Sequence, residues 1–271
     1  QVSGNMARMT MITAFLTLAC LFTGWPDAGA ECVDEVALAT LKENLQSAIE
    51  LEWATIPPYL TAWLSIKHKH GTNTYVRDML HGIFVDEMHH LALAANMLNA
   101  IGGEPVLNDP GKAPRYPGPL PAEALPSLTV TLEKMSRAHT KKVFMGIETP
   151  ECHDSVRKFF PVLSKAASSK ASEEDEKSPV DKTFPGLLDK CNEKHYIPET
   201  IGGIYIHKIL CPMLKLEKDA RACEPIRQSI FKGDHERQLS NPFKIRQLFG
   251  AVRAIALIVS QGEGGDPCNP Y

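Results

Sequence analysis

Apolar residues recur at helical spacing through most of the chain. Between residues 34 and 68, and again between 75 and 101, they return every three or four positions, which predicts two long amphipathic helices. Further helices are predicted from about residue 136 to 150, from residue 200, and from about residue 243 to a glycine-rich end in "QGEGG" at residues 261–265. The segment 104–126 is rich in proline and glycine and is predicted to be a long loop. The pattern indicates a single all-α domain.

The core-facing stripe of the second long helix contains an acid and an imidazole. The stripe runs through Leu80, Ile83, Glu87, His90, Ala94, Met97 and Ile101. An unpaired charge is costly to bury, so such groups are retained where they are paired, hydrogen-bonded or bound to a metal. Glu87 and His90 are therefore the first candidates for a functional site.

Carboxylates interrupt the apolar stripes of three other helices as well. Glu52 lies on the inward stripe of the first helix, whereas Glu50 falls on the polar side and is expected to be solvated. Glu148 follows Phe144 by one turn in the third helix, and Glu263 ends the stripe of the last helix. Four helices are thus predicted to direct a carboxylate at one interior.

Facing glutamates combined with a Glu-x-x-His motif are typical of metal-carboxylate centres in helical bundles. The carboxylates neutralise divalent iron or manganese, and the histidine adds a nitrogen ligand. The pattern predicts Glu52, Glu87, His90 and Glu148 as ligands of one or two ions per chain. A mononuclear site and a degraded site remain open alternatives.

The first thirty residues are typical of a secretory signal peptide. After Met6 the sequence has an arginine, an apolar run and an Ala-Gly-Ala end, which predicts cleavage after Ala30 and a mature domain at residues 31–271. The apolar run is shorter than the about 20 residues of a membrane span, so an exported, extracellular product is expected.

Cysteine usage agrees with export. One of the seven cysteines, Cys20, lies in the leader, and the other six predict three disulfides whose pairing the sequence does not choose. The polar segment 164–182 is predicted to be a mobile insertion. A net charge of −3 and a pI near 6.4 argue against nucleic acid or an anionic membrane surface as the main partner. Neither the oligomeric state nor the small-molecule substrate is predicted.

Six motifs along the chain resemble one protein family. They are "LQSAIELEWATIPPYLTAWLSIK", "DEMHHLALAANMLNAIGGEP", "YPGPLP", "IETPE", "TIGGIY" and "AIALIVSQGEG". In this order they resemble the ferritin-like domain associated with the iminophenyl-pyruvate dimer synthase of violacein biosynthesis. The resemblance covers residues 36–264 and implies a ferritin-like four-helix bundle with long loops and extra helices, stapled by disulfides.

The resemblance also implies roles for single residues. It carries metal ligation onto Glu52, Glu87, His90 and Glu148, and it places Tyr59 beside Glu52 as a hydrogen-bond partner. The family has a glutamate where this chain has Gly203, and relatives continue beyond this chain's last helix. His207, one turn after Gly203, is the candidate substitute ligand. Glu263 is a further candidate ligand, with a helix-end cap as the alternative role.

Two functions follow from this reading. The first is an exported oxidative metalloenzyme that acts on a small organic substrate with iron or manganese. The second is a non-catalytic extracellular binding or matrix protein that keeps the bundle but has a degraded metal centre. The three carboxylates and His90 favour the enzyme, whereas Gly203 favours the binding protein.

Overall fold

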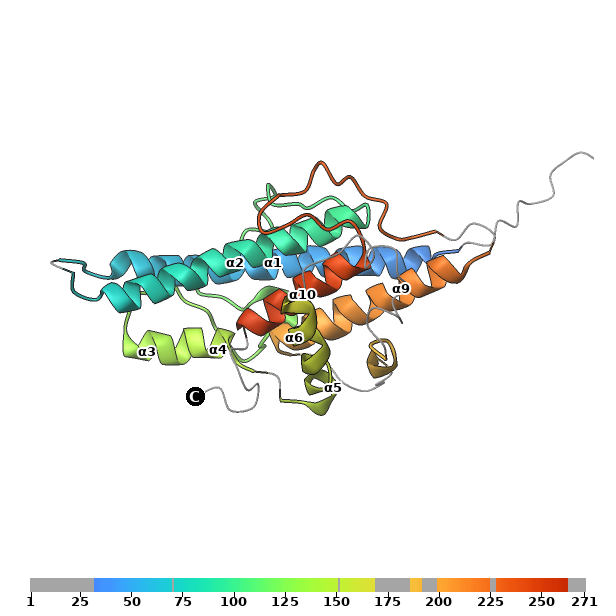
Figure 1. Cartoon of the computed structure of the whole chain (residues 1–271). Coiled ribbons are helices and arrows are strands. Elements are labelled where there is room, and N and C mark those ends of the chain that lie inside the picture. Colours follow the sequence, from blue (N-terminus) through green and yellow to red (C-terminus); the bar gives the residue numbers. More distant parts are fainter. Residues whose placement is uncertain are drawn as a thin grey trace, which may run out of the picture. The chain divides into compact units, whose positions relative to one another are not determined.

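Two long helices form the frame of the protein. A computed structural model describes residues 32–69, 71–150, 152–168, 186–191, 199–224 and 228–262. Helices α1 (Glu35–Ser65) and α2 (Thr74–Ala100) are joined by a short connection and lie side by side (Figure 1). Their bounds lie within three residues of those predicted from the apolar pattern.

Local side-chain chemistry explains where these helices begin and end. The carboxylate of Asp34 accepts a 2.9 Å hydrogen bond from the backbone N–H of Ala37, which caps the first turn of α1. Asn73 precedes α2 in the left-handed conformation that asparagine tolerates. After α2, Gly102 adopts φ +74°, which ends the helix at the predicted position.

The remaining helices are built in two continuous runs and several short pieces. The first run comprises α3 (Arg137–His139), the π-helix η2 (Thr140–Phe144) and α4 (Met145–Ile147). The second comprises α8 (Ile201–Ile204), the π-helix η4 (Tyr205–Leu210) and α9 (Cys211–Ala222). The others are η1 (Pro121–Glu123), α5 (Asp154–Arg157), α6 (Phe160–Ser168), η3 (Asp189–Cys191) and α10 (Leu248–Gly262).

These elements confirm the predicted all-α fold. In the described part of the chain the only β pairing is an isolated bridge between Gly118 and Val130. Residues 164–168, the start of the predicted mobile insertion, instead form the end of α6, where Ala166 is buried. Residues 169–182 and the predicted leader lie outside the described residues. Within the described ranges, no helix is both long enough and apolar enough to cross a bilayer.

Two prolines in the middle of α1 shape the helix next to Glu52. Pro57 and Pro58 lack the N–H groups that would bond the carbonyls of Trp53 and Ala54. The hydroxyl of Tyr116 donates a 2.6 Å hydrogen bond to the Ala54 carbonyl oxygen and so replaces one of these bonds. Burial raises the pKa of Tyr116, which keeps this hydroxyl protonated as a donor. The long loop thereby braces α1 at its double proline.

The buried apolar residues form two clusters that meet at the middle of α1 and α2. The first cluster includes Leu45 and Ile49 of α1 and Leu93 of α2. The second includes Leu51 of α1 and Phe84 of α2. The polar interruptions of both stripes fall between the two clusters, so they face the interior at the level where one apolar cluster gives way to the other.

Two disulfides tie the described residues together. Cys32, just before α1, is bonded to Cys223 at the end of α9, and Cys191 is bonded to Cys211. The prediction of disulfides is therefore confirmed for four cysteines. Cys152 is exposed, and the two other cysteines, Cys20 and Cys268, lie outside the described residues.

Candidate metal centre

Glu52, Glu87 and His90 converge at the level where the two apolar clusters meet. One ligand atom of each lies within 4.8 Å of the others, and all three side chains are buried. The Nδ1 atom of His90 lies 3.7 Å from Oε2 of Glu52 and 3.8 Å from Oε2 of Glu87. These separations are too long for direct hydrogen bonds.

The spacing and the donor types fit a shared metal ion. Bonds of about 2.0–2.2 Å from an ion to imidazole nitrogen and carboxylate oxygen place neighbouring ligand atoms about 3–4 Å apart. Two carboxylates with one imidazole form a donor set suited to iron or manganese. A divalent cation would also offset the cost of burying the negative charges.

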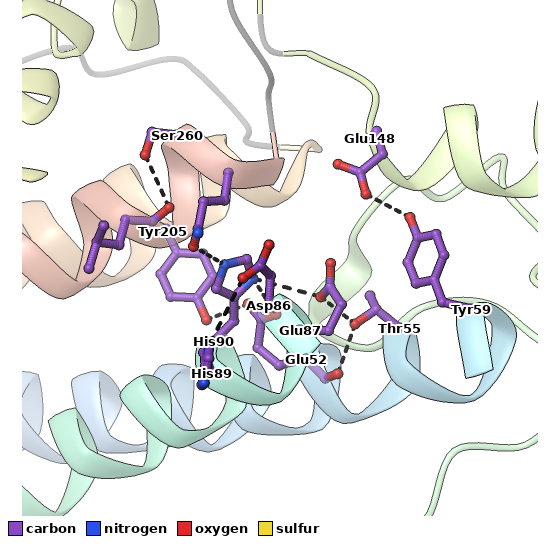
Figure 2. Close-up of polar contacts among 12 residues, drawn as sticks. Glu52, Thr55, Tyr59, Asp86, Glu87, His89, His90, Glu148, Tyr205 and Ser260 are labelled. Carbon is purple, nitrogen blue, oxygen red and sulfur yellow. Dashed lines mark hydrogen bonds and ion pairs between the residues drawn. The ribbon is translucent and has the colours of Figure 1, made fainter. Parts of the chain in front are cut away.

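Each ligand candidate is held by a hydrogen-bond partner on another element (Figure 2). The hydroxyl of Tyr205, in η4, donates to Oε1 of Glu52 at 2.6 Å. The hydroxyl of Thr55, in α1, donates to Oε2 of Glu87 at 2.6 Å. Each carboxylate therefore keeps a fixed orientation, because one of its oxygens is bonded to a buried hydroxyl group.

His90 is oriented by Gln261 near the end of α10. Oε1 of Gln261 lies 2.9 Å from Nε2 of His90. An amide oxygen only accepts hydrogen bonds, so Nε2 carries the proton and donates. The lone pair of a neutral His90 ring is then on Nδ1, the nitrogen that faces both carboxylates.

Glu148 lies across the same cavity from the other three residues. It is the residue after α4, and its Oε1 accepts a 2.6 Å hydrogen bond from the hydroxyl of Tyr59. A small cavity of about 20 Å³ is lined by Glu52, Glu87, His90, Ile147, Glu148, Thr149, Ile201, Gly202, Ile258 and Val259. This volume holds an ion or about one water molecule.

The acids in this cavity have strongly perturbed proton affinities. Burial raises the pKa of Glu52, and burial with the charge of Glu87 raises the pKa of Glu148 to about 8. Burial alone would lower the pKa of His90, but contact with Glu52 and Glu87 outweighs it and raises that pKa well above 6.5. Without a metal ion, these side chains therefore hold protons. A metal ion would have to displace those protons in order to bind.

Two of the predicted site residues do not make the contacts expected from the sequence. Tyr59 hydrogen-bonds Glu148 rather than Glu52, whose hydroxyl donor is Tyr205. His207 does not join the carboxylates; it lines a different cavity of about 430 Å³ beside Cys191 and Cys211. Glu263 lies outside the described residues.

Gly203 and Glu50 complete the list of positions singled out in the sequence. Gly203 is buried, but its neighbour Gly202 is the glycine that lines the small cavity. Glu50 is half-buried and accepts hydrogen bonds from Gln46 and Lys112, away from the site. Glu50 lies apart from the other carboxylates as expected, but it is paired with Lys112 and only 19% of its side chain is exposed, so the prediction that it is solvated is wrong.

Sequence reasoning missed Thr55, Tyr205 and Gln261 as partners of the ligand candidates. Thr55 carried a usable signal, because it follows Glu52 by three residues on the same stripe. Tyr205 carried a weaker one: a tyrosine in an apolar run is expected to find a hydrogen-bond partner when buried. Nothing in the local pattern distinguished Gln261.

Comparison with protein families agrees with this architecture. A family model described as "Ferritin-like" matches residues 45–269. A crystal structure of a ferritin-like protein from Caulobacter vibrioides is similar at 20% sequence identity and a TM-score of 0.48, covering 83% of this chain and 67% of that one. No curated protein matches the chain.

Proposed function

The chain belongs to the ferritin-like family, and from that premise we propose that it is an exported oxidative metalloenzyme that holds iron or manganese at Glu52, Glu87 and His90. The observation that carries the proposal is the convergence of these three buried side chains on one point. A bound ion of either metal supplies redox chemistry towards dioxygen or peroxide. Glu148, across the cavity, is the candidate ligand for a second ion.

The protein supplies orientation and exclusion of water. Tyr205, Thr55 and Gln261 hold the two carboxylates and the imidazole before any ion enters. The ligand atoms therefore need little rearrangement on binding. Apolar side chains of Ile147, Ile258 and Val259 line the rest of the cavity and limit access of bulk water.

The cavity size restricts the kind of molecule that reaches the centre. About 20 Å³ admits water or a molecule of dioxygen size, but not an organic substrate. Thr149 lines the cavity and is also exposed, so the cavity approaches the surface there. A small organic substrate would bind at this mouth, next to the residues that would hold the ion.

Export fits the covalent chemistry of the chain. Two disulfides are typical of proteins in oxidising compartments, and the predicted leader would direct the chain there. We place the protein outside the cell on these two grounds.

Metal binding and dioxygen consumption test the proposal in sequence. Protein reconstituted anaerobically with ferrous iron or manganous ion is expected to bind between one and two ions per chain, measured by elemental analysis after desalting. The iron-loaded protein should then consume dioxygen faster than an equal concentration of free iron. Absence of bound iron and manganese would contradict the proposal and favour the non-catalytic extracellular binding protein.

A further inference from the structure

One end of the α1–α2 hairpin combines exposed apolar side chains with an excess of positive charge. We define this hairpin end as residues 64–69, 71–80 and 131–137. The first and the last of these ranges are tied together by a 2.7 Å hydrogen bond from the backbone N–H of Met135 to Oγ of Ser65. Figure 1 shows α3, which begins at Arg137, near the connection between α1 and α2.

Exposed large apolar residues are concentrated at this end. Nine occur in the described part of the chain, and five of them belong to the hairpin end: Leu64, Tyr75, Val76, Met79 and Leu132. Tyr75 is 77% exposed and Leu64 is 67% exposed. Apolar residues scattered singly over a surface are ordinary, but this grouping indicates a surface that binds a partner.

The charge of the hairpin end is opposite in sign to that of the whole chain. Its basic residues are Lys67, Lys69, Arg77, Lys134 and Arg137, and its acidic residues are Asp78 and Glu133. Five cations against two acids leave +3, whereas the full chain has a net charge of −3. The partner is therefore expected to be anionic.

The combination of exposed apolar groups and cations selects among anionic partners. A second copy of the same end is disfavoured, because an isologous contact would bring two positively charged surfaces together. Cations alone would suffice for an acidic polymer, which leaves Leu64, Tyr75 and Met79 without a role. An anionic lipid bilayer uses both features, since apolar side chains enter the acyl boundary while lysines and arginines meet the headgroups.

We propose that the hairpin end docks the protein on anionic lipid bilayers as a peripheral contact. The apolar residues enter the interfacial region, and the five cations attract the charged headgroups. The metal candidates lie further along α1 and α2 and take no part in this contact.

Vesicle co-sedimentation tests the proposal directly. The full-length mature protein should bind phosphatidylcholine vesicles that contain phosphatidylserine and should not bind vesicles of phosphatidylcholine alone. High salt should weaken the binding, because it screens the headgroup charge. Equal binding to both vesicle types, or none to either, overturns the proposal.

Matched variants locate the surface. Replacing Lys67 and Lys69 together by glutamine should lower the partition coefficient about thirtyfold, given the effect of a single cation near a charged bilayer. The same change at Lys215 and Lys218, two exposed lysines of α9, should leave binding unaltered. Equal losses from both pairs would mean that the attraction is not local to the hairpin end.

Apolar variants separate a bilayer from other anionic partners. Met79→Ser should weaken vesicle binding, whereas Met88→Ser should not, although both methionines are 50% exposed on α2. Retention on immobilised heparin with no binding to vesicles would overturn the proposal in favour of an acidic polymer. A dimer that Met79→Ser dissociates, with no binding to vesicles, would overturn it in favour of self-association.

Discussion

The hydroxyl of Tyr205 donates a 2.6 Å hydrogen bond to Oε1 of Glu52, and both side chains are almost completely buried. The bond joins the π-helix η4 to the middle of α1. The carboxylate is thus oriented by a residue 153 positions away in the sequence. The geometry of Glu52 therefore depends on η4 as much as on its own helix.

Tyr205→Phe should reduce metal affinity without unfolding the protein. Glu52 would lose its donor, so we expect about 10–100-fold weaker metal binding. The free energy of unfolding of the metal-free protein should fall by about 1 kcal/mol, as for loss of one buried hydrogen bond. Competition with a fluorescent chelator and urea unfolding measure the two effects.

Tyr116→Phe is the matched control for this variant. Tyr116 also donates a 2.6 Å bond to α1, but its acceptor is the Ala54 carbonyl. This variant should lose about 1 kcal/mol of stability and keep its metal affinity. Equal loss of affinity in both variants would contradict a specific role for Tyr205.

Removal of a predicted ligand should abolish most metal binding and leave the fold intact. Glu87→Gln and His90→Ala should each lower affinity at least about tenfold, because each deletes one of three converging donors. Helicity by circular dichroism should change little, since both apolar clusters and the disulfides remain. Equilibrium dialysis with manganous ion measures the loss.

Two further variants test whether the correct residues have been chosen. Glu50→Gln alters a carboxylate of α1 that pairs with Lys112, and His207→Ala alters the histidine of the other cavity. Both should bind metal like the unmodified protein. Loss of an ion from His207→Ala would revive its prediction as a substitute ligand.

Metal affinity should rise with pH across the neutral range. In the metal-free protein the pKa of Glu148 is raised to about 8 and that of His90 is raised well above 6.5, so protons compete with the ion below these values. Isothermal titration in buffers of different ionisation enthalpy should detect proton release on binding. The Glu148→Gln variant should release fewer protons per metal ion bound. An unchanged number would exclude Glu148 as a source of the released protons.

The same pKa shifts set the pH dependence of the metal-free fold. Glu148 holds a proton in the folded state that the unfolded chain loses above about pH 4.5, so the folded state binds more protons between that value and about 8. Stability contributed by this proton is lost as the pH rises through that window. Urea unfolding of chelator-treated protein should show the decline, and added metal should remove it.

The mature protein should contain no free thiol. Two disulfides account for four cysteines, and the even count then pairs Cys152 with Cys268. Mass spectrometry of non-reduced peptides should find this third bridge, and the intact secreted chain should begin at Glu31. An alkylated Cys152 in unreduced protein, or a chain that retains Met6, would contradict these expectations.

Much of the frame and part of the site could be predicted from helical periodicity. Glu52, Glu87 and His90 face the interior because regular α-helix repeats place them on the same stripes as the core residues. Asp34 and Gly102 lie at the ends of the two predicted ranges, where the structure shows an N-cap hydrogen bond and a left-handed glycine. Regular spacing carried these inferences, and it held in α1 and α2.

The π-helices account for what periodicity missed. His207 was expected on the face of Gly203 because it follows by one α-helical turn. It instead lies in η4, where hydrogen bonds span five residues and each turn is wider. A wider turn changes which residues share a helix face; here Tyr205 contacts Glu52, whereas His207 lines the other cavity. The pattern of apolar residues does not predict a change from α-helix to π-helix.

The net charge of the chain also failed to predict the positive charge of the hairpin end. The total of −3 argued against an anionic surface as partner, yet the hairpin end carries +3. Residues 131–137 join that end only through tertiary contacts such as the bond between Met135 and Ser65. A sum over the chain cannot detect charges that folding brings together.

The polar layer between the two apolar clusters has a consequence for cooperativity. Without an ion, α1 and α2 meet at this level through buried polar side chains instead of apolar packing, so we expect this layer to open more easily than the clusters on either side. Amide groups next to the second cluster can then exchange with solvent by partial opening, while those of the first cluster remain protected. An ion bound by Glu52, Glu87 and His90 would cross-link the two helices in this layer, and the two clusters would then unfold as one unit.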